Sequence, residues 1–102
     1  MTARSFDVYR VMLPMFNEAI YALQEQVVKA EDVDVAMKWG CGMSRGLLTI
    51  AQEKGFDWCL AELQSYQKIH GERFRPAWLL SKLVNAGIHD FSQLAQAPMA
   101  VR

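Results

Sequence analysis

An apolar stripe near the N-terminus constrains the fold more than any other feature of the sequence. Its members recur every three or four positions from residue 6 to residue 27: Phe6, Tyr9, Leu13, Phe16, Ile20, Leu23 and Val27. This is the periodicity of one face of an α-helix, sustained for about six turns. A second stripe lies beside it, made of Val8, Met12, Met15, Ala19 and Ala22. We therefore expect a helix buried from two sides and kinked at Pro14 rather than divided into two helices.

The rest of the chain predicts four further helices, separated mainly by glycines. Acidic residues open the second helix near residue 29 and Gly40 closes it, a glycine-rich turn covers 40–46, and the next two helices end at Gly55 and Gly71. Pro76 suits the first position of a last helix that runs from about residue 77 to 86 and is capped by Gly87. No run alternates apolar and polar residues over the length of a strand. The fold class is therefore all-α, with about five helices and no β-sheet.

The length of the chain allows one domain with one core. Of 102 residues, we assign 1–5 to an N-terminal extension, 6–87 to the helical domain and 88–102 to a tail that could form one short helix. Eleven basic and eleven acidic residues cancel, so the overall charge favours neither nucleic acid nor an anionic membrane. We find no signal peptide or membrane span, and Cys41 and Cys59 stand alone. Two free thiols in a cytoplasmic protein are the simplest interpretation.

Several groups of residues have the chemistry of a site but not its context. The glycines of the 40–46 turn follow a helix rather than a strand, so we expect an inter-helix turn and no cofactor site. His70 and His89 have no activated nucleophile that the sequence can show, so no catalytic residue is assigned. The acidic residues 31, 32 and 34 lie too close along one helix to converge on an ion, so no metal is expected.

Two patterns allow a structural and a functional interpretation. Arg73 and Arg75 flank Phe74 and could hold a phosphate or a base, although packing of Phe74 with both charges in water is favoured. The three tryptophans, at positions 39, 58 and 78, are most simply core residues. Since a chain of this size has little room for three Trp, six Met and five Phe, some of them should line an interface.

Several motifs, in order, resemble the C-terminal domain of 3-hydroxyacyl-CoA dehydrogenases. Residues 8–20 are similar to the family's V-N-R-x-x-x-P-x-x-x-E-A-I, and residues 30–40 to its aeDiDxAmklG. Residues 46–57 follow GPfeLaDxxGlD, and residues 72–87 follow eryrPxxlLxxlvxaG. The resemblance covers about residues 6–87 and implies a helical bundle like the C-terminal domain of 6-phosphogluconate dehydrogenase.

The resemblance implies a two-part enzyme that oxidises 3-hydroxyacyl-CoA in fatty-acid β-oxidation. A Rossmann domain would hold NAD and the catalytic histidine, and the helical domain would close the acyl-CoA cleft and form the dimer. This chain has no counterpart of the Rossmann domain, so we expect no NAD site and no hydride transfer from it alone. Acyl-CoA would be bound only together with the Rossmann domain.

Departures from the family pattern argue against a catalytic role. Tyr9 stands where the family has its active-site Asn, and a phenol cannot reproduce the acceptor and two donors of a carboxamide. Leu47, Leu48 and Gln52 replace the Pro, Phe and Asp of G-P-F-x-L-x-D, and the glycine-rich tail is missing. These changes resemble the degenerate second copy of the domain in fused members, which pairs with the first copy as a pseudo-dimer.

The leading hypothesis is thus a non-catalytic helical domain that forms a homodimer or pseudo-dimer, or docks onto a dehydrogenase. The substrate or interface candidates are Tyr9, Met12, Phe16, Leu47, Leu48, Arg73 and Arg75. A second hypothesis is a small acyl-CoA or lipid-binding domain, in which Met12, Met15, Leu47 and Leu48 line a pocket and Arg73 or Arg75 meets phosphates. A third is an assembly adaptor with no link to β-oxidation.

Overall fold

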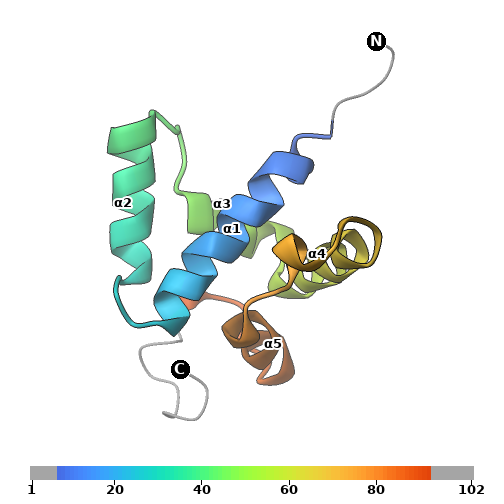
Figure 1. Cartoon of the computed structure of the whole chain (residues 1–102). Helices are drawn as coiled ribbons and strands as arrows, with labels where there is room; N and C mark the ends of the chain where they lie inside the picture. Colours follow the sequence, from blue (N-terminus) through green and yellow to red (C-terminus); the bar gives the residue numbers. More distant parts are fainter. Residues whose placement is uncertain (1–6, 93–102) are drawn as a thin grey trace.

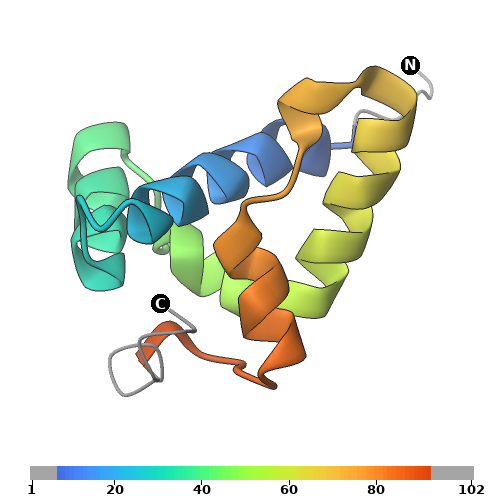
Figure 2. The same ribbon diagram turned by 60° about the horizontal axis from the view of Figure 1, so that its bottom comes forward.

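The computed structural model describes residues 7–92 and contains five α-helices, with no strand in that range. They are α1 (Tyr9–Gln24), α2 (Ala30–Cys41), α3 (Leu47–Lys54), α4 (Phe56–His70) and α5 (Trp78–Asn85). A single turn of 3₁₀-helix, η1 (Glu72–Phe74), connects α4 to α5. Helix α1 crosses the middle of the molecule, with α2 on one side and α4 and α5 on the other (Figures 1 and 2). The expected all-α class is confirmed.

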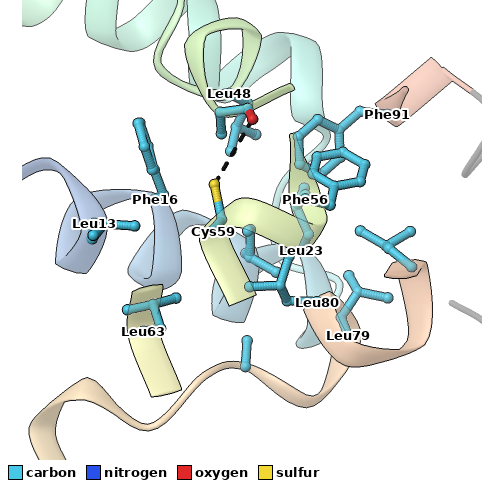
Figure 3. Close-up of a cluster of buried hydrophobic side chains, with 14 of the residues drawn as sticks. Leu13, Phe16, Leu23, Leu48, Phe56, Cys59, Leu63, Leu79, Leu80 and Phe91 are labelled. Carbon is cyan, nitrogen blue, oxygen red and sulfur yellow. Dashed lines mark hydrogen bonds between the residues drawn. The ribbon is translucent and has the colours of Figure 1, made fainter. Parts of the chain in front are cut away.

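The core forms where α1, α3, α4 and α5 meet. Its fully buried side chains include Leu13, Phe16, Ile20, Leu48, Cys59, Leu63, Phe74, Leu79, Leu80 and Leu83. Figure 3 shows side chains of this cluster converging from the four helices and from Phe91. Apolar burial of this kind is the main force holding such a domain together, at about 25 cal/mol per Å².

Helix α1 is continuous through Pro14, as expected. The first apolar stripe is buried at Leu13, Phe16, Ile20 and Leu23, whereas Met12, Met15 and Ala19 of the second stripe are only partly buried. The helix is therefore buried on one side and half-covered on the other, because α2 leaves part of this face open.

Two predicted helix boundaries were wrong. Helix α2 continues past Gly40 to Cys41 and ends at Gly42, whose φ of 71° is the left-handed conformation that suits glycine. Helix α5 begins at Trp78, so Pro76 precedes the helix instead of opening it. The reason is tertiary, since the Asn17 side chain on α1 accepts a hydrogen bond from the Ala77 backbone N–H.

The tryptophans are less buried than the sequence suggested. Trp39 is 84% exposed and Trp78 is 52% exposed, so their assignment to the core was wrong, while Trp58 is half-buried. The charged segment before α5 follows the structural interpretation, with Phe74 buried and Arg73 and Arg75 in solvent.

Packed side chains continue beyond Gly87, where the sequence ended the helical domain. Phe91 is buried against Phe56, with ring centroids 4.8 Å apart, and its N–H donates to Gln52 Oε1 at 2.5 Å. The expected extension at residues 1–5, and most of the expected tail, lie outside the described residues.

Candidate functional site

The seven residues selected from the sequence occupy three different environments. Phe16, Leu47 and Leu48 are core residues, each no more than 3% exposed. Met12 is half-buried beside the core, and Tyr9 lies part-exposed at the start of α1. Arg73 and Arg75 are exposed, the first within η1 and the second directly after it. The structure therefore does not gather these seven residues into one surface.

Tyr9 belongs to a cluster that draws on three helices. Its ring meets that of Trp58 on α4 edge-on, with centroids 5.1 Å apart. Lys54, the last residue of α3, holds its Nζ 4.8 Å from the Tyr9 centroid and 4.5 Å from that of Trp58. An ammonium group over two aromatic faces is favourable by about 0.5–2 kcal/mol and is held in place. We call Tyr9, Lys54 and Trp58 the tyrosine face.

A second aromatic and basic cluster adjoins η1. The Arg10 guanidinium lies 4.8 Å from the Phe74 ring centroid and 5.9 Å from that of Tyr66. The Tyr66 hydroxyl donates to Asp7 Oδ2 at 3.3 Å, and partial burial followed by the charge of Asp7 raises the Tyr66 pKa. Arg10 is thus packed between α1, α4 and η1 rather than free to meet an anion.

The two arginines that flank Phe74 are also engaged. Arg73 stacks over the Phe74 ring, with its guanidinium carbon 5.2 Å from the centroid. Arg75 pairs with Glu72, and the hydrogen bonds of Glu72 with Arg75 and Gln67 lower the Glu72 pKa. Both contacts are at the surface, so they leave room for a phosphate but do not build a site for one.

Asn17 is a buried polar position that sequence reasoning missed. Among the described residues it is the one buried polar or charged side chain, 4% exposed. Its carboxamide is hydrogen-bonded to the segment before α5. Nδ2 donates to the Arg75 carbonyl at 2.7 Å, and Oδ1 accepts from the Ala77 N–H at 2.8 Å. The signal was available, because Asn17 falls four positions after Leu13 and three before Ile20, on the buried face.

The glycine turn does not fit a dinucleotide. The N-terminus of α3, where a pyrophosphate would need free N–H groups, is already capped by Asp34. Its Oδ1 accepts from the Leu48 N–H at 2.6 Å, and its Oδ2 accepts from the Thr49 N–H at 3.2 Å and the Thr49 hydroxyl at 2.6 Å. A carboxylate in this position occupies the donors and repels a second anion.

An apolar groove lies between α1 and α2. It has a volume of about 460 Å³ and is lined by Pro14, Met15, Glu18, Ala19, Val33, Met37 and Leu47. Met15 and Leu47 of the proposed pocket thus line it, whereas Met12 and Leu48 do not. Neither Arg73 nor Arg75 lines this groove, and the Arg75 carbonyl accepts from Asn17, a residue of α1 that does not line it either.

Among residues 7–92, no group of three or more His, Cys, Asp or Glu side chains could hold a metal ion. None of the described helices combines the length and apolar character that a bilayer crossing requires. Burial raises the pKa of the Cys59 thiol to about 12, and its Sγ lies 3.8 Å from the Ala51 carbonyl oxygen (Figure 3). Such a thiol is not a nucleophile at neutral pH.

The described residues form a small domain of five α-helices. The chain belongs to the family described as "3-hydroxyacyl-CoA dehydrogenase, C-terminal domain", whose model matches residues 6–93. The resemblance in the sequence is therefore confirmed.

The relatives are longer proteins. The chain is 43% identical over 84 residues to a 3-hydroxybutyryl-CoA dehydrogenase of Bradyrhizobium diazoefficiens, and the matched region covers 81% of this chain and 29% of the relative. It is 40% identical over 80 residues to a probable 3-hydroxybutyryl-CoA dehydrogenase of Deinococcus radiodurans, covering 78% and 29%. The crystal structure of (S)-3-hydroxybutyryl-CoA dehydrogenase PaaH1 from Ralstonia eutropha superposes with a TM-score of 0.75 at 37% identity, over 80% of this chain and 29% of that one. The chain thus spans less than a third of these proteins.

Proposed function

We propose that this chain is the helical part of a 3-hydroxyacyl-CoA dehydrogenase and has no hydride-transfer activity alone. In this proposal it docks against a Rossmann domain that carries NAD and the catalytic histidine, closes the acyl-CoA cleft, and dimerises. Support comes from the family match over residues 6–93 and from relatives that extend well beyond the matched part. The 3-hydroxybutyryl-CoA named for those relatives suggests a short acyl chain. A cytoplasmic location stays a prediction.

The tyrosine face is the observation that carries this proposal. In the family motif that residues 8–20 resemble, the active-site Asn stands at the position of Tyr9. Here that position is part-exposed, and Lys54 and Trp58 hold the ring from two other helices. A face built in this way offers a phenol and a cation to a neighbouring domain. We infer that it closes over the acyl-CoA while Tyr9 limits the chemistry, since a phenol lacks the carbonyl acceptor and paired N–H donors of Asn.

The test is reconstitution with the remainder of a relative. The part of the Bradyrhizobium diazoefficiens enzyme that this chain does not match is produced separately and mixed with the chain. Reduction of acetoacetyl-CoA is followed by the loss of NADH absorbance. We expect no activity from the chain alone, measurable activity from the mixture, and at least about a tenfold higher rate with Tyr9→Asn, because a correctly placed polar group contributes about 10²-fold.

The matched control is Lys29→Ala, an exposed position before α2 and outside the tyrosine face. It should leave the reconstituted rate unchanged. If neither the chain nor its Tyr9→Asn variant changes the rate of the isolated fragment, and no complex forms on a sizing column, the proposal is wrong.

The apolar groove favours a second candidate, an acyl-chain or lipid-binding domain. Its lining is almost wholly apolar, and two flexible methionines, Met15 and Met37, contribute to it. A basic group to meet phosphates is missing from the residues that line it. Calorimetric titration of the chain with a medium-chain acyl-CoA decides this candidate, and the absence of heat and of binding would exclude it.

A further inference from the structure

Lys54, the cation of the tyrosine face, has no carboxylate partner among residues 7–92. Its exposed side chain places Nζ 4.8 Å from the ring centroid of Tyr9 and 4.5 Å from that of Trp58. The ion pairs within the described part of the chain are formed by other side chains. An ammonium group that rests on two aromatic rings keeps N–H donors for a further partner.

The acidic residues nearest to Lys54 in the sequence are engaged elsewhere. Glu53 forms an ion pair with Arg45. Asp57 lies in the first turn of α4, where the helix dipole favours a carboxylate, and it accepts a hydrogen bond from the Trp58 backbone N–H at 2.9 Å. The positive charge of Lys54 is therefore not paired within the described chain, and it suits an anionic group supplied from outside.

The place of Lys54 indicates which anion would reach it. This step rests on the proposed function, in which Tyr9 occupies the position of the family's active-site Asn and so faces the reacting end of the acyl-CoA. The CoA phosphates are separated from that end by the whole pantetheine arm. A carboxylate three carbon–carbon bonds beyond the reacting carbon lies about 4 Å from it, at about 1.5 Å per bond. This length is comparable to the 4.8 Å between Lys54 Nζ and the Tyr9 ring centroid.

The family motif does not fix the residue type at position 54. Residues 46–57 follow GPfeLaDxxGlD, and Lys54 corresponds to the second of the two variable positions before the glycine. A lysine at such a position adds a charge to the tyrosine face without replacing a residue that the motif specifies. It therefore suits a preference among substrates rather than the chemistry that members of the family share.

We propose that Lys54 is a specificity-determining residue that binds the terminal carboxylate of a short dicarboxylic acyl chain. The complete enzyme then prefers 3-hydroxyacyl-CoA esters whose acyl chain ends in a carboxylate. Tyr9 and Trp58 hold the ammonium group in place, and the carboxylate forms a charge-assisted hydrogen bond with it. A neutral acyl chain leaves this cation unpaired in a cleft closed to water, which is unfavourable. The preference therefore comes from charge.

The test compares 3-oxoadipyl-CoA with 3-oxohexanoyl-CoA in the reconstituted complex. Their acyl chains have the same length and differ at the last carbon, a carboxylate in the first and a methyl group in the second. The ratio of their kcat/KM values, followed by NADH absorbance, should favour 3-oxoadipyl-CoA and fall at least about tenfold in Lys54→Met. Lys54→Arg should keep the preference and Lys54→Glu should reverse it. Lys68→Met, at an exposed position in the last turn of α4, is the matched control and should leave the ratio unchanged.

The outcomes separate this inference from the proposed function. An unchanged ratio in Lys54→Met, or an equal loss on both substrates, would overturn the inference while an active mixture keeps the proposed function. Equal loss would instead place Lys54 against the CoA phosphates or an acidic group of the neighbouring domain. If the complex forms without turnover, the ratio of dissociation constants for adipyl-CoA and hexanoyl-CoA decides in the same way. A mixture that forms no complex would overturn the proposed function and this inference with it.

Discussion

Replacement of Asn17 by alanine should destabilise the fold more than any other polar substitution considered for this chain. The Ala77 N–H would lose its partner at a buried site, whereas the Arg75 carbonyl would keep the Tyr21 hydroxyl, which lies 3.1 Å away. One buried donor without a partner costs about 1–3 kcal/mol, and loss of the carboxamide contacts brings the expected total to about 2–3 kcal/mol. The free energy of unfolding of a small domain is only about 5–15 kcal/mol, so the midpoint of thermal unfolding should fall by about 10–20 °C.

Urea unfolding followed by tryptophan fluorescence measures this loss. Tyr21→Phe is the matched control, because it removes a hydrogen bond to the same Arg75 carbonyl but leaves that of Asn17. It should cost less than about 1 kcal/mol. A cost below about 0.5 kcal/mol for Asn17→Ala, or equal costs for the two variants, would refute the reasoning.

Asn17→Asp adds a test by pH. At neutral pH the new carboxylate would face the Arg75 carbonyl, which a carboxamide N–H meets in the native chain. Burial and this carbonyl should raise the pKa of the introduced acid in the folded state. The protonated acid can donate to the Arg75 carbonyl, whereas the carboxylate cannot. The folded variant is therefore least stable above the folded-state pKa, and its stability recovers as pH falls. Its deficit relative to the wild type should therefore shrink between pH 7 and pH 4, and a constant deficit would contradict this.

Four further predictions concern the α3 cap, the two cysteines and the core. In Gly46→Ala the new Cβ would overlap the Asp34 carboxylate, at a φ of −64° that any residue adopts, so the displaced cap should cost about 1–2 kcal/mol in urea unfolding. Asp34→Ala should cost as much and the double variant no more, and additive costs would show that the two positions act independently. In the native chain one thiol, the exposed Cys41, should react with an aromatic disulfide at pH 8, and two should react after unfolding. Burial raises the Cys59 pKa from 9.0 to about 12. The stabilisation from the buried thiol is therefore complete below pH 9 and is lost as pH rises toward 12. Relative to Cys59→Ala, the free energy of unfolding of the wild type should fall by about 1 kcal/mol between pH 9 and 10, and parallel pH profiles of the two proteins would contradict this. Leu63→Ala should cost about 2–5 kcal/mol and Gln64→Ala, at an exposed position, within about 0.5 kcal/mol, as measured by denaturant unfolding.

Local rules were sufficient for the helices and most of their ends. The three- and four-residue spacing of Leu13, Phe16 and Ile20 identifies the buried face of α1 without reference to any other segment. Gly55 and Gly71 end α3 and α4 because their positive φ angles suit glycine alone. Helical periodicity and helix termination of this kind depend on a few neighbouring residues, so they can be read from the sequence directly.

Local rules failed at two helix boundaries, the end of α2 and the start of α5, which depend on backbone conformation or on distant hydrogen-bond partners. At α2 the sequence predicted an end at Gly40, and only the backbone shows that Gly42 is the left-handed residue that ends the helix. At α5 the hydrogen bonds of Asn17 and Gln24, both on α1, decide where the helix begins. A contact across about sixty residues leaves no periodic signal near either end.

Membership of the family and the all-α class were determined by the sequence itself, through ordered motifs and helical periodicity. Whether each apolar residue is buried in the core or exposed was decided by the tertiary structure. Leu47 and Leu48, selected as interface candidates, are buried, while Trp39, assigned to the core, is 84% exposed. The physical reason is that periodicity shows which face of a helix is apolar, but not whether this chain or another one covers it. For α2, the described part of this chain leaves the outer face uncovered.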